Sequence, residues 1–122
     1  MKITIFGAGA IGGHLGALLS RDGVKVSLIA RGAHLKAMRE NGLKLILEDS
    51  EFTVHPRVTD DPAALGPQDY VVVSLKSHQA PDAVEAMQPL LGPDSTVVTA
   101  MNGMPWWYFY KLQGAHENYQ IQ

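Results

Sequence analysis

The stretch TIFGAGAIGGHLGALL, residues 4–19, carries five glycines between a β-type run and a helical pattern. The run Lys2–Phe6 is short and rich in β-forming residues, which predicts a buried strand. Asp22-Gly23 is typical of a helix end. Between the two, apolar residues recur at helical spacing, which predicts one buried helix face made of Ile11, Leu15, Leu18 and Leu19. We therefore expect a strand, a tight turn and a helix in direct succession.

The composition is that of one globular domain. The chain has 122 residues, of which 46% are hydrophobic and 18% charged, and its net charge is −2. Lysine and arginine form no cluster, so we expect neither nucleic acid nor a membrane surface as a partner. The absence of cysteine excludes a disulfide scaffold, a zinc–cysteine site and a thiol nucleophile. No apolar run resembles a signal peptide or approaches the roughly 20 residues of a membrane span, so we expect a cytoplasmic protein.

Further strands are expected at intervals along the chain. The polar segment 59–68 contains two prolines and predicts a loop with at most one helical turn, and 92–94 predicts a turn. Alternating polarity over 43–55 predicts a hairpin or two short strands. Short β-rich apolar runs predict three more strands: Val24–Ala30, Tyr70–Leu75 and Thr96–Ala100.

Two more helices separate these strands. Leu35 and Met38 mark a short helix that ends at Asn41-Gly42. Another begins near Pro81, and its predicted buried face consists of Val84, Met87 and Leu91. Pro89 is expected to kink or end this helix. Strands that alternate with helices predict an α/β fold, with a doubly wound, mostly parallel sheet covered on both faces.

The glycines form the motif G-x-G-x-x-G, which is Gly7-Ala8-Gly9-Ala10-Ile11-Gly12. The motif follows a strand and opens a helix, which is its context in Rossmann-type dinucleotide-binding domains. Gly7 allows the tight turn, Gly9 lets a pyrophosphate approach the backbone, and Gly12 lets the helix lie close to the sheet. The alternative is a glycine-rich turn that binds nothing.

Arg31, after the second strand, indicates which dinucleotide binds. NAD-binding domains usually carry an acid at this place, which hydrogen-bonds the ribose 2′-hydroxyl. A guanidinium can instead bind a 2′-phosphate in bidentate fashion, so Arg31 favours NADPH over NADH. The alternative is that Arg31 is an ordinary exposed arginine in a turn.

Polar residues also follow two later strands, where ligands bind in open α/β sheets. Lys76 is suited to a phosphate or carboxylate, and Asn102 to a substrate carbonyl or a nicotinamide amide. The alternatives are that Lys76 is a solvated loop lysine and that Asn102 is part of an Asn-Gly turn. His78 is more typical of a surface histidine than of a catalyst, and the remaining histidines lack metal-ligand spacing, so no metal site is expected.

Together these residues resemble the ketopantoate reductase (2-dehydropantoate 2-reductase) family. The resemblance covers nearly the whole chain and rests on GAGAIGG at 7–13, Arg31, SLKSHQ at 74–79 and MNGMPWWYFY at 101–110. It implies NADPH-dependent reduction of a 2-keto acid, ketopantoate to pantoate, in pantothenate and coenzyme A biosynthesis. It also implies that Lys76 lies near the cofactor and that Asn102 touches both cofactor and substrate.

One departure from the family concerns the catalytic residue. The family's general acid is a lysine in a second, helical domain, which also supplies most substrate-binding residues, and no residue of 1–122 matches it. We therefore expect 1–122 to be the dinucleotide-binding domain, truncated near residue 122, with no catalytic residue of its own. The alternatives are a non-catalytic NADPH-binding module and a related reductase that acts on another keto acid or an imine.

The aromatic run 106–110 raises a separate expectation. Five consecutive aromatic residues would form an exposed apolar patch if no second domain covered them. We therefore expect the chain by itself to form dimers or larger oligomers through this end.

Overall fold

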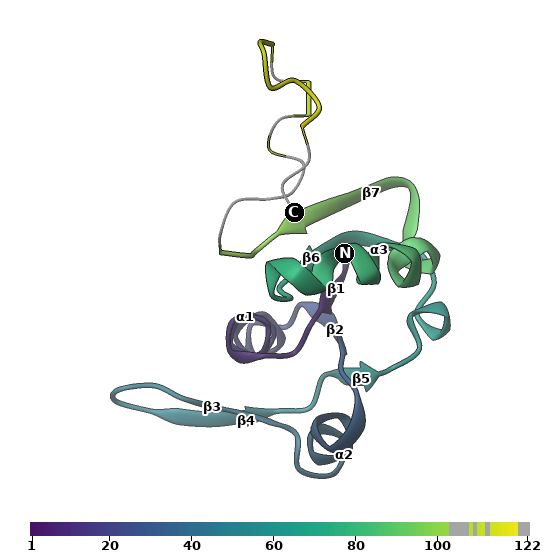
Figure 1. The fold of residues 1–122 in the computed structure, drawn as a ribbon. Helices are drawn as coiled ribbons and strands as arrows, with labels where there is room; N and C mark the ends of the chain where they lie inside the picture. Colours follow the sequence, from purple (N-terminus) through teal and green to yellow (C-terminus); the bar gives the residue numbers. More distant parts are fainter. Residues whose placement is uncertain (103–107, 109, 112, 120–122) are drawn as a thin grey trace.

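The computed structural model describes residues 1–102, 108, 110, 111 and 113–119. Its main sheet has five strands in the order β5-β2-β1-β6-β7, and all neighbouring pairs are parallel (Figure 1). These strands are β1 (Lys2–Phe6), β2 (Lys25–Ile29), β5 (Arg57–Thr59), β6 (Gln68–Val73) and β7 (Leu91–Thr99). The parallel α/β sheet predicted from the sequence is confirmed.

Helices cover both faces of this sheet, as expected for a doubly wound fold. Helices α1 (Ala10–Arg21) and α2 (Gly32–Asn41) pack on one face, against a core that contains Ile5 and Leu28. Helix α3 (Ala80–Met87) packs on the other face, against Phe6 and Val71. Successive residues of β1 point to opposite faces, so Ile5 and Phe6 belong to different halves of the core.

Helix α1 lies so close to the sheet that its buried face carries almost no side chains. A Cβ at Gly12 would collide with the Gly7 carbonyl oxygen and the Ser74 hydroxyl. The prediction that Ile11 belongs to the buried face is therefore wrong, because the side chain is 50% exposed. The buried residues are Gly12, Gly13, Gly16 and Ala17, while Leu15 and Leu19 pack only partly against the core.

The predicted hairpin forms a separate two-stranded sheet beside the main one. Strands β3 (Leu43–Ile46) and β4 (Glu51–Val54) are antiparallel and project from the body of the domain (Figure 1). An ion pair of 3.0 Å joins Lys44 Nζ to Glu51 Oε2 across the two strands. The hairpin follows α2 directly, after Gly42, and its inner end lies against α1.

Three details differ from the predictions. Strand β5 was not predicted, because three residues are too few to show a pattern, although Val58 and Thr59 are buried. Strand β7 begins at Leu91 rather than at Thr96, and the predicted turn at 92–94 lies within it, opposite an irregularity in β6. In α3, Val84 is 42% exposed and the buried residues are Ala80, Ala83 and Met87.

Short 3-10 turns complete the connections. η1 (Pro62–Ala64) lies in the predicted loop, η2 (Ser77–Gln79) precedes α3, and η3 (Gln88–Leu90) follows it. Of the two outcomes expected at Pro89, a kink or an end, the structure shows that α3 ends before it. None of the helices in the described part of the chain is long and apolar enough to span a bilayer. Most of the aromatic run 106–110 lies outside the described residues, although Tyr108 and Tyr110 are described and exposed.

Candidate functional site

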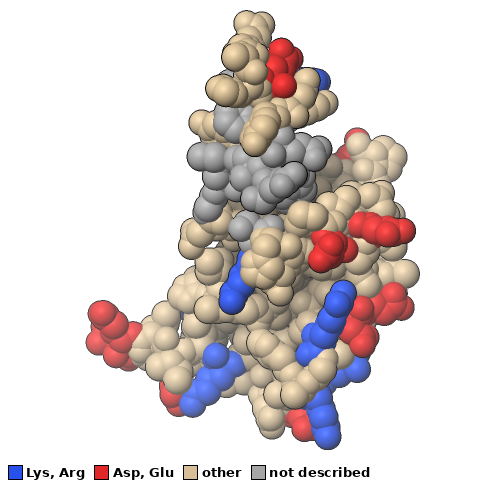
Figure 2. Space-filling model, in the orientation of Figure 1, with Lys and Arg blue, Asp and Glu red and all other residues tan. Residues whose placement is uncertain are grey.

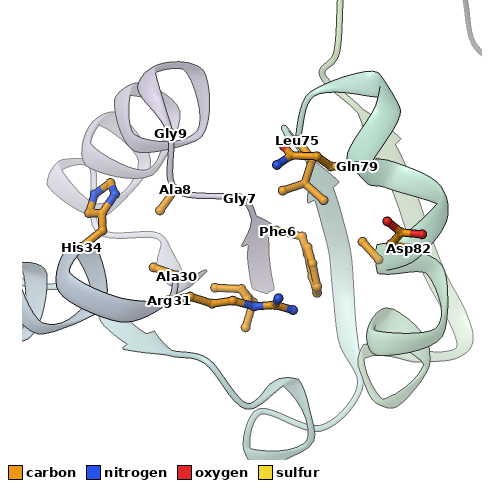
Figure 3. A pocket seen from close by; sticks show the side chains of 12 residues that line it. Phe6, Gly7, Ala8, Gly9, Ala30, Arg31, His34, Leu75, Gln79 and Asp82 are labelled. Carbon is orange, nitrogen blue, oxygen red and sulfur yellow. The ribbon is translucent and has the colours of Figure 1, made fainter.

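A cavity of about 420 Å³ opens where β1, β2 and β6 end, between the turn after β1 and helix α3 (Figure 3). It lies at the carboxyl edge of the sheet, where ligands bind in open α/β folds. The residues that line it are Phe6, Gly7, Ala8, Gly9, Ile29, Ala30, Arg31, His34, Leu75, Gln79, Asp82 and Ala83. The structure thus brings the start of the glycine motif and Arg31 to one cavity.

The turn after β1 is held by the end of β6. Gly7 has a φ of +106°, which side-chain-bearing residues rarely adopt, and its carbonyl oxygen accepts a 2.6 Å hydrogen bond from Ser74 Oγ. The backbone N–H of Ser74 donates to the Phe6 carbonyl oxygen at 3.0 Å. Ser74 was missed as a site residue from the sequence, because it lies within the predicted strand Tyr70–Leu75, whereas β6 ends at Val73.

Gly9 faces open space. A Cβ built on Gly9 would meet no atom within 4 Å, so the packing of the described residues does not require glycine there. Gly9 is the N-cap of α1, no side chain caps this helix end, and its first turn carries no acidic residue. The amide groups and the positive end of the helix dipole are therefore left for an anion outside the protein.

The rest of the glycine motif lies around this helix end. Ala8 is buried and lines the main cavity, and Ala10 is exposed at the side of the helix that faces the hairpin. Ile11 lines a smaller neighbouring cavity, and Gly12 is buried against the sheet. Ala8 and Gly12 are therefore the buried residues of the motif, and the other residues border the cavities.

Arg31 occupies the carboxyl end of β2 and is the N-cap of α2. Its side chain is exposed and extends across the cavity (Figure 3). It makes no hydrogen bond or ion pair with another residue of the described part of the chain. A guanidinium in this state has all its donors available for a ligand.

The opposite wall of the cavity comes from the segment after β6. Gln79 belongs to η2, and its Oε1 accepts a hydrogen bond of 3.3 Å from the backbone N–H of Lys76. Asp82 stands in the first turn of α3 and faces the cavity from the side opposite His34 (Figure 3). Neither Asp82 nor His34 was singled out from the sequence as a site residue, and only their place in the first turn after a strand-end loop could have indicated it.

Lys76 and Asn102 meet at a second cavity of about 260 Å³. Its remaining lining residues are Ile11, Ser74, Leu75, Ala100 and Met101. The two predicted residues come from the ends of neighbouring strands, β6 and β7, which the hydrogen bond from Ala100 N to Val73 O keeps together at 2.8 Å. Leu75 lines both cavities, so they adjoin each other.

The two cavities together form one elongated site along the carboxyl edge of the sheet. Arg31, whose guanidinium has no partner among the described residues, lies at one end, and Lys76 and Asn102 lie at the other. The uncapped N-terminus of α1 at Gly9 lies between them. Such a series suits an elongated ligand with phosphate groups in its middle. The described residues contain no group of three or more side chains that could ligate a metal ion.

Positive and negative side chains are mixed on the surface in view. Figure 2 shows lysine and arginine side chains interspersed with acidic ones on the face in view, with no broad basic patch. Within the described residues, three cations are paired with acids: Arg21, Lys36 and Lys44.

A model of the family described as "Ketopantoate reductase PanE/ApbA" matches residues 3–105. A 2-dehydropantoate 2-reductase of Mesorhizobium japonicum is 50% identical over 123 residues, which cover 99% of this chain and 37% of that protein. The chain therefore spans little more than a third of the length of this curated relative.

Solved structures of related proteins have the same fold as this chain. A crystal structure of a proposed ketopantoate reductase from Ralstonia solanacearum MolK2 has a TM-score of 0.89 at 42% identity, covering 98% of this chain and 37% of that one. A ternary structure of D-mandelate dehydrogenase with NADH and anilino(oxo)acetate has a TM-score of 0.78 at 28% identity. The match covers 85% of this chain and 34% of that one.

Proposed function

Since this chain belongs to the ketopantoate reductase PanE/ApbA family, we propose that residues 1–122 form the dinucleotide-binding domain of an NADPH-dependent oxidoreductase. The reaction that we propose for the whole enzyme is reduction of the 2-keto acid ketopantoate to pantoate, a step of pantothenate and coenzyme A biosynthesis. The curated relative at 50% identity is a 2-dehydropantoate 2-reductase, which supports this reaction.

The observation that carries the proposal is the open space in front of Gly9. A glycine that the protein's own packing does not need, placed at an uncapped helix end, suits a backbone that a pyrophosphate must approach. Gly7 and Gly12 are different, because backbone conformation and close packing account for them. Glycine is a favoured N-cap residue, and the approach of a ligand to the backbone is a second physical reason for glycine at this position.

Arg31 supports NADPH rather than NADH. It stands at the end of β2, where the adenosine ribose lies in this fold class, and its guanidinium has no partner among the described residues. A 2′-phosphate would accept charge-assisted hydrogen bonds from it, whereas a 2′-hydroxyl would gain little.

The residues at the other end of the site would orient the reacting groups. When bound, the cofactor supplies a hydride from its nicotinamide ring to the keto carbon. The Asn102 amide can donate to the substrate carbonyl oxygen, which polarises it, and the Lys76 ammonium can hold a phosphate or the substrate carboxylate. The general acid that protonates the oxygen is expected outside 1–122, as the resemblance to the family implies.

Titration with NADPH and NADH, followed by ligand fluorescence, tests this function. We expect the unmodified chain to bind NADPH more tightly, and Arg31→Ala to lose about tenfold in NADPH affinity while NADH affinity stays nearly constant. Arg21→Ala is the matched control, because Arg21 stands at the far end of α1 and pairs with Asp22. Equal affinities for the two cofactors in both the unmodified chain and Arg31→Ala would contradict NADPH specificity.

A second candidate is a related dehydrogenase that acts on a different 2-keto acid. The similarity to D-mandelate dehydrogenase, solved with NADH and anilino(oxo)acetate, favours this candidate. Steady-state assays of the full-length enzyme with ketopantoate and with aromatic 2-keto acids separate the two. A kcat/KM for an aromatic acid that exceeds the value for ketopantoate would support the second candidate.

A further inference from the structure

His34 stands on the wall that separates the main cavity from a third cavity of about 290 Å³. Three of the described residues, Ala8, Gly9 and His34, line both cavities. His34 belongs to the first turn of α2, three residues after Arg31, so both residues project from the same end of the helix. Figure 3 shows the imidazole beside Ala8 in the turn after β1, and the Arg31 side chain extending from the same helix end across the cavity, with its guanidinium pointing away from the imidazole.

The imidazole is available to a ligand. It is exposed, and it makes no hydrogen bond or ion pair with another residue in the part of the chain that the structure describes. Like a guanidinium, a protonated imidazole is a charged hydrogen-bond donor, but it is shorter and its ring is held close to the helix. His34 and Arg31 would therefore reach the same anion from different directions.

The charged groups near His34 are Arg31 on its own helix, Lys44 on β3, Glu51 on β4 and Asp82 on α3. Lys44 is paired with Glu51, and Asp82 lies on the opposite wall of the main cavity. Arg31 is therefore the cation that attracts an anion to the side of the main cavity where His34 stands.

We propose that His34 is a second specificity-determining residue, which together with Arg31 binds the 2′-phosphate of the cofactor. The inference rests on the proposed NADPH-binding function and extends it. The adenosine ribose lies at the end of β2 in this fold class, which is where the main cavity brings Arg31 and His34 together. Two donors that enclose the phosphate from two sides discriminate more strongly against a 2′-hydroxyl than Arg31 alone.

Isothermal titration calorimetry of the 122-residue chain with 2′,5′-ADP and with 5′-AMP tests the inference. We expect His34→Gln to lower the affinity ratio of 2′,5′-ADP to 5′-AMP by roughly tenfold. His34→Lys, which places a cationic donor at the same position, restores the ratio. His14→Gln is the matched control, because His14 lines the third cavity but not the main one, and it leaves the ratio unchanged.

The outcomes separate this inference from the proposed function. If Arg31→Ala lowers the ratio and His34→Gln does not, the role of His34 is refuted and NADPH binding stands. If His14→Gln lowers the ratio as much as His34→Gln, the effect is a general electrostatic one and the inference fails. If the unmodified chain does not prefer 2′,5′-ADP and Arg31→Ala changes nothing, NADPH specificity fails and the inference with it. Affinity for 5′-AMP reports in each variant that the domain is folded.

Discussion

The hydroxyl of Ser74 donates a hydrogen bond of 2.6 Å to the carbonyl oxygen of Gly7, so the end of β6 fixes the turn that leaves β1. The two residues are 67 positions apart in the chain. The same hydroxyl lies against the backbone of Gly12, where a Cβ would collide with it. One side chain thus fixes both the turn and the spacing between α1 and the sheet.

Replacement of Ser74 tests this relationship. We expect Ser74→Ala to lower the free energy of unfolding by about 1–2 kcal/mol, since the carbonyl oxygen of Gly7 loses its donor in a partly buried place. NADPH affinity should fall as well, because the turn is less well fixed. Urea denaturation and cofactor titration measure the two effects. Ser50→Ala, in the exposed hairpin turn, is the control, and an equal effect of both variants would refute the role of Ser74.

Gly9 and Gly12 should respond to alanine in opposite ways. Gly9→Ala is expected to change stability by less than about 1 kcal/mol and to weaken NADPH binding at least tenfold, because its Cβ enters space that the protein leaves open. Gly12→Ala is expected to destabilise the domain by about 3 kcal/mol, because its Cβ collides with backbone. Thermal unfolding and cofactor titration distinguish the variants. Full cofactor affinity in Gly9→Ala would show that no phosphate approaches this glycine.

The chain by itself should bind cofactor without efficient turnover. It spans 37% of the length of its 50% identical relative, and the resemblance to the family assigns the general acid to the remainder. We expect NADPH oxidation in the presence of ketopantoate to stay near the rate without enzyme, although NADPH fluorescence reports binding. The full-length protein is the control. Ketopantoate reduction by residues 1–122 at the full-length rate would contradict the domain assignment.

Self-association through the aromatic run is a prediction from the sequence. We expect light scattering to show dimers or larger species as the concentration rises, and replacement of Trp106 and Trp107 by serine to abolish them. Strand β7 is the alternative surface, since it is one of the two edge strands of the main sheet and its Val97 and Val98 are 45% and 41% exposed. If Val97→Lys abolishes association and the tryptophan replacements do not, the interface lies at β7 and not at the aromatic run. A monomer at all concentrations would refute both.

Much of the fold could be read from local pattern. The strand–turn–helix of residues 2–21, the hairpin, and the end of α2 at Asn41 each depend on neighbouring residues, and the structure agrees with them. Predictions failed where contacts between distant residues decide the outcome. Ile11 and Val84 occupy helical positions that suit burial, yet both are exposed, because glycine and alanine faces lie closer to the sheet.

The candidate site divides in the same way. The glycine motif, Arg31, Lys76 and Asn102 could be found from the sequence, because each stands directly after a predicted strand and parallel strands end at one edge. The sequence did not single out Ser74, His34 or Asp82 as site residues, because none of them has a distinctive spacing. All three share one property, which is that each lies just after a strand or in the first turn of a helix at that edge of the sheet.

The sequence by itself determined that the chain forms a parallel α/β domain whose first strand is followed by a glycine motif and a helix. Periodicity and the special backbone freedom of Gly7 are local properties, so they can be read without a structure. Only the tertiary structure decided that Gly9 faces open space while Gly12 faces the carbonyl of Gly7, and that His34 joins Arg31 at one cavity. These relationships depend on how closely α1, α2 and β6 approach one another, and that distance is set by packing between residues far apart in the chain.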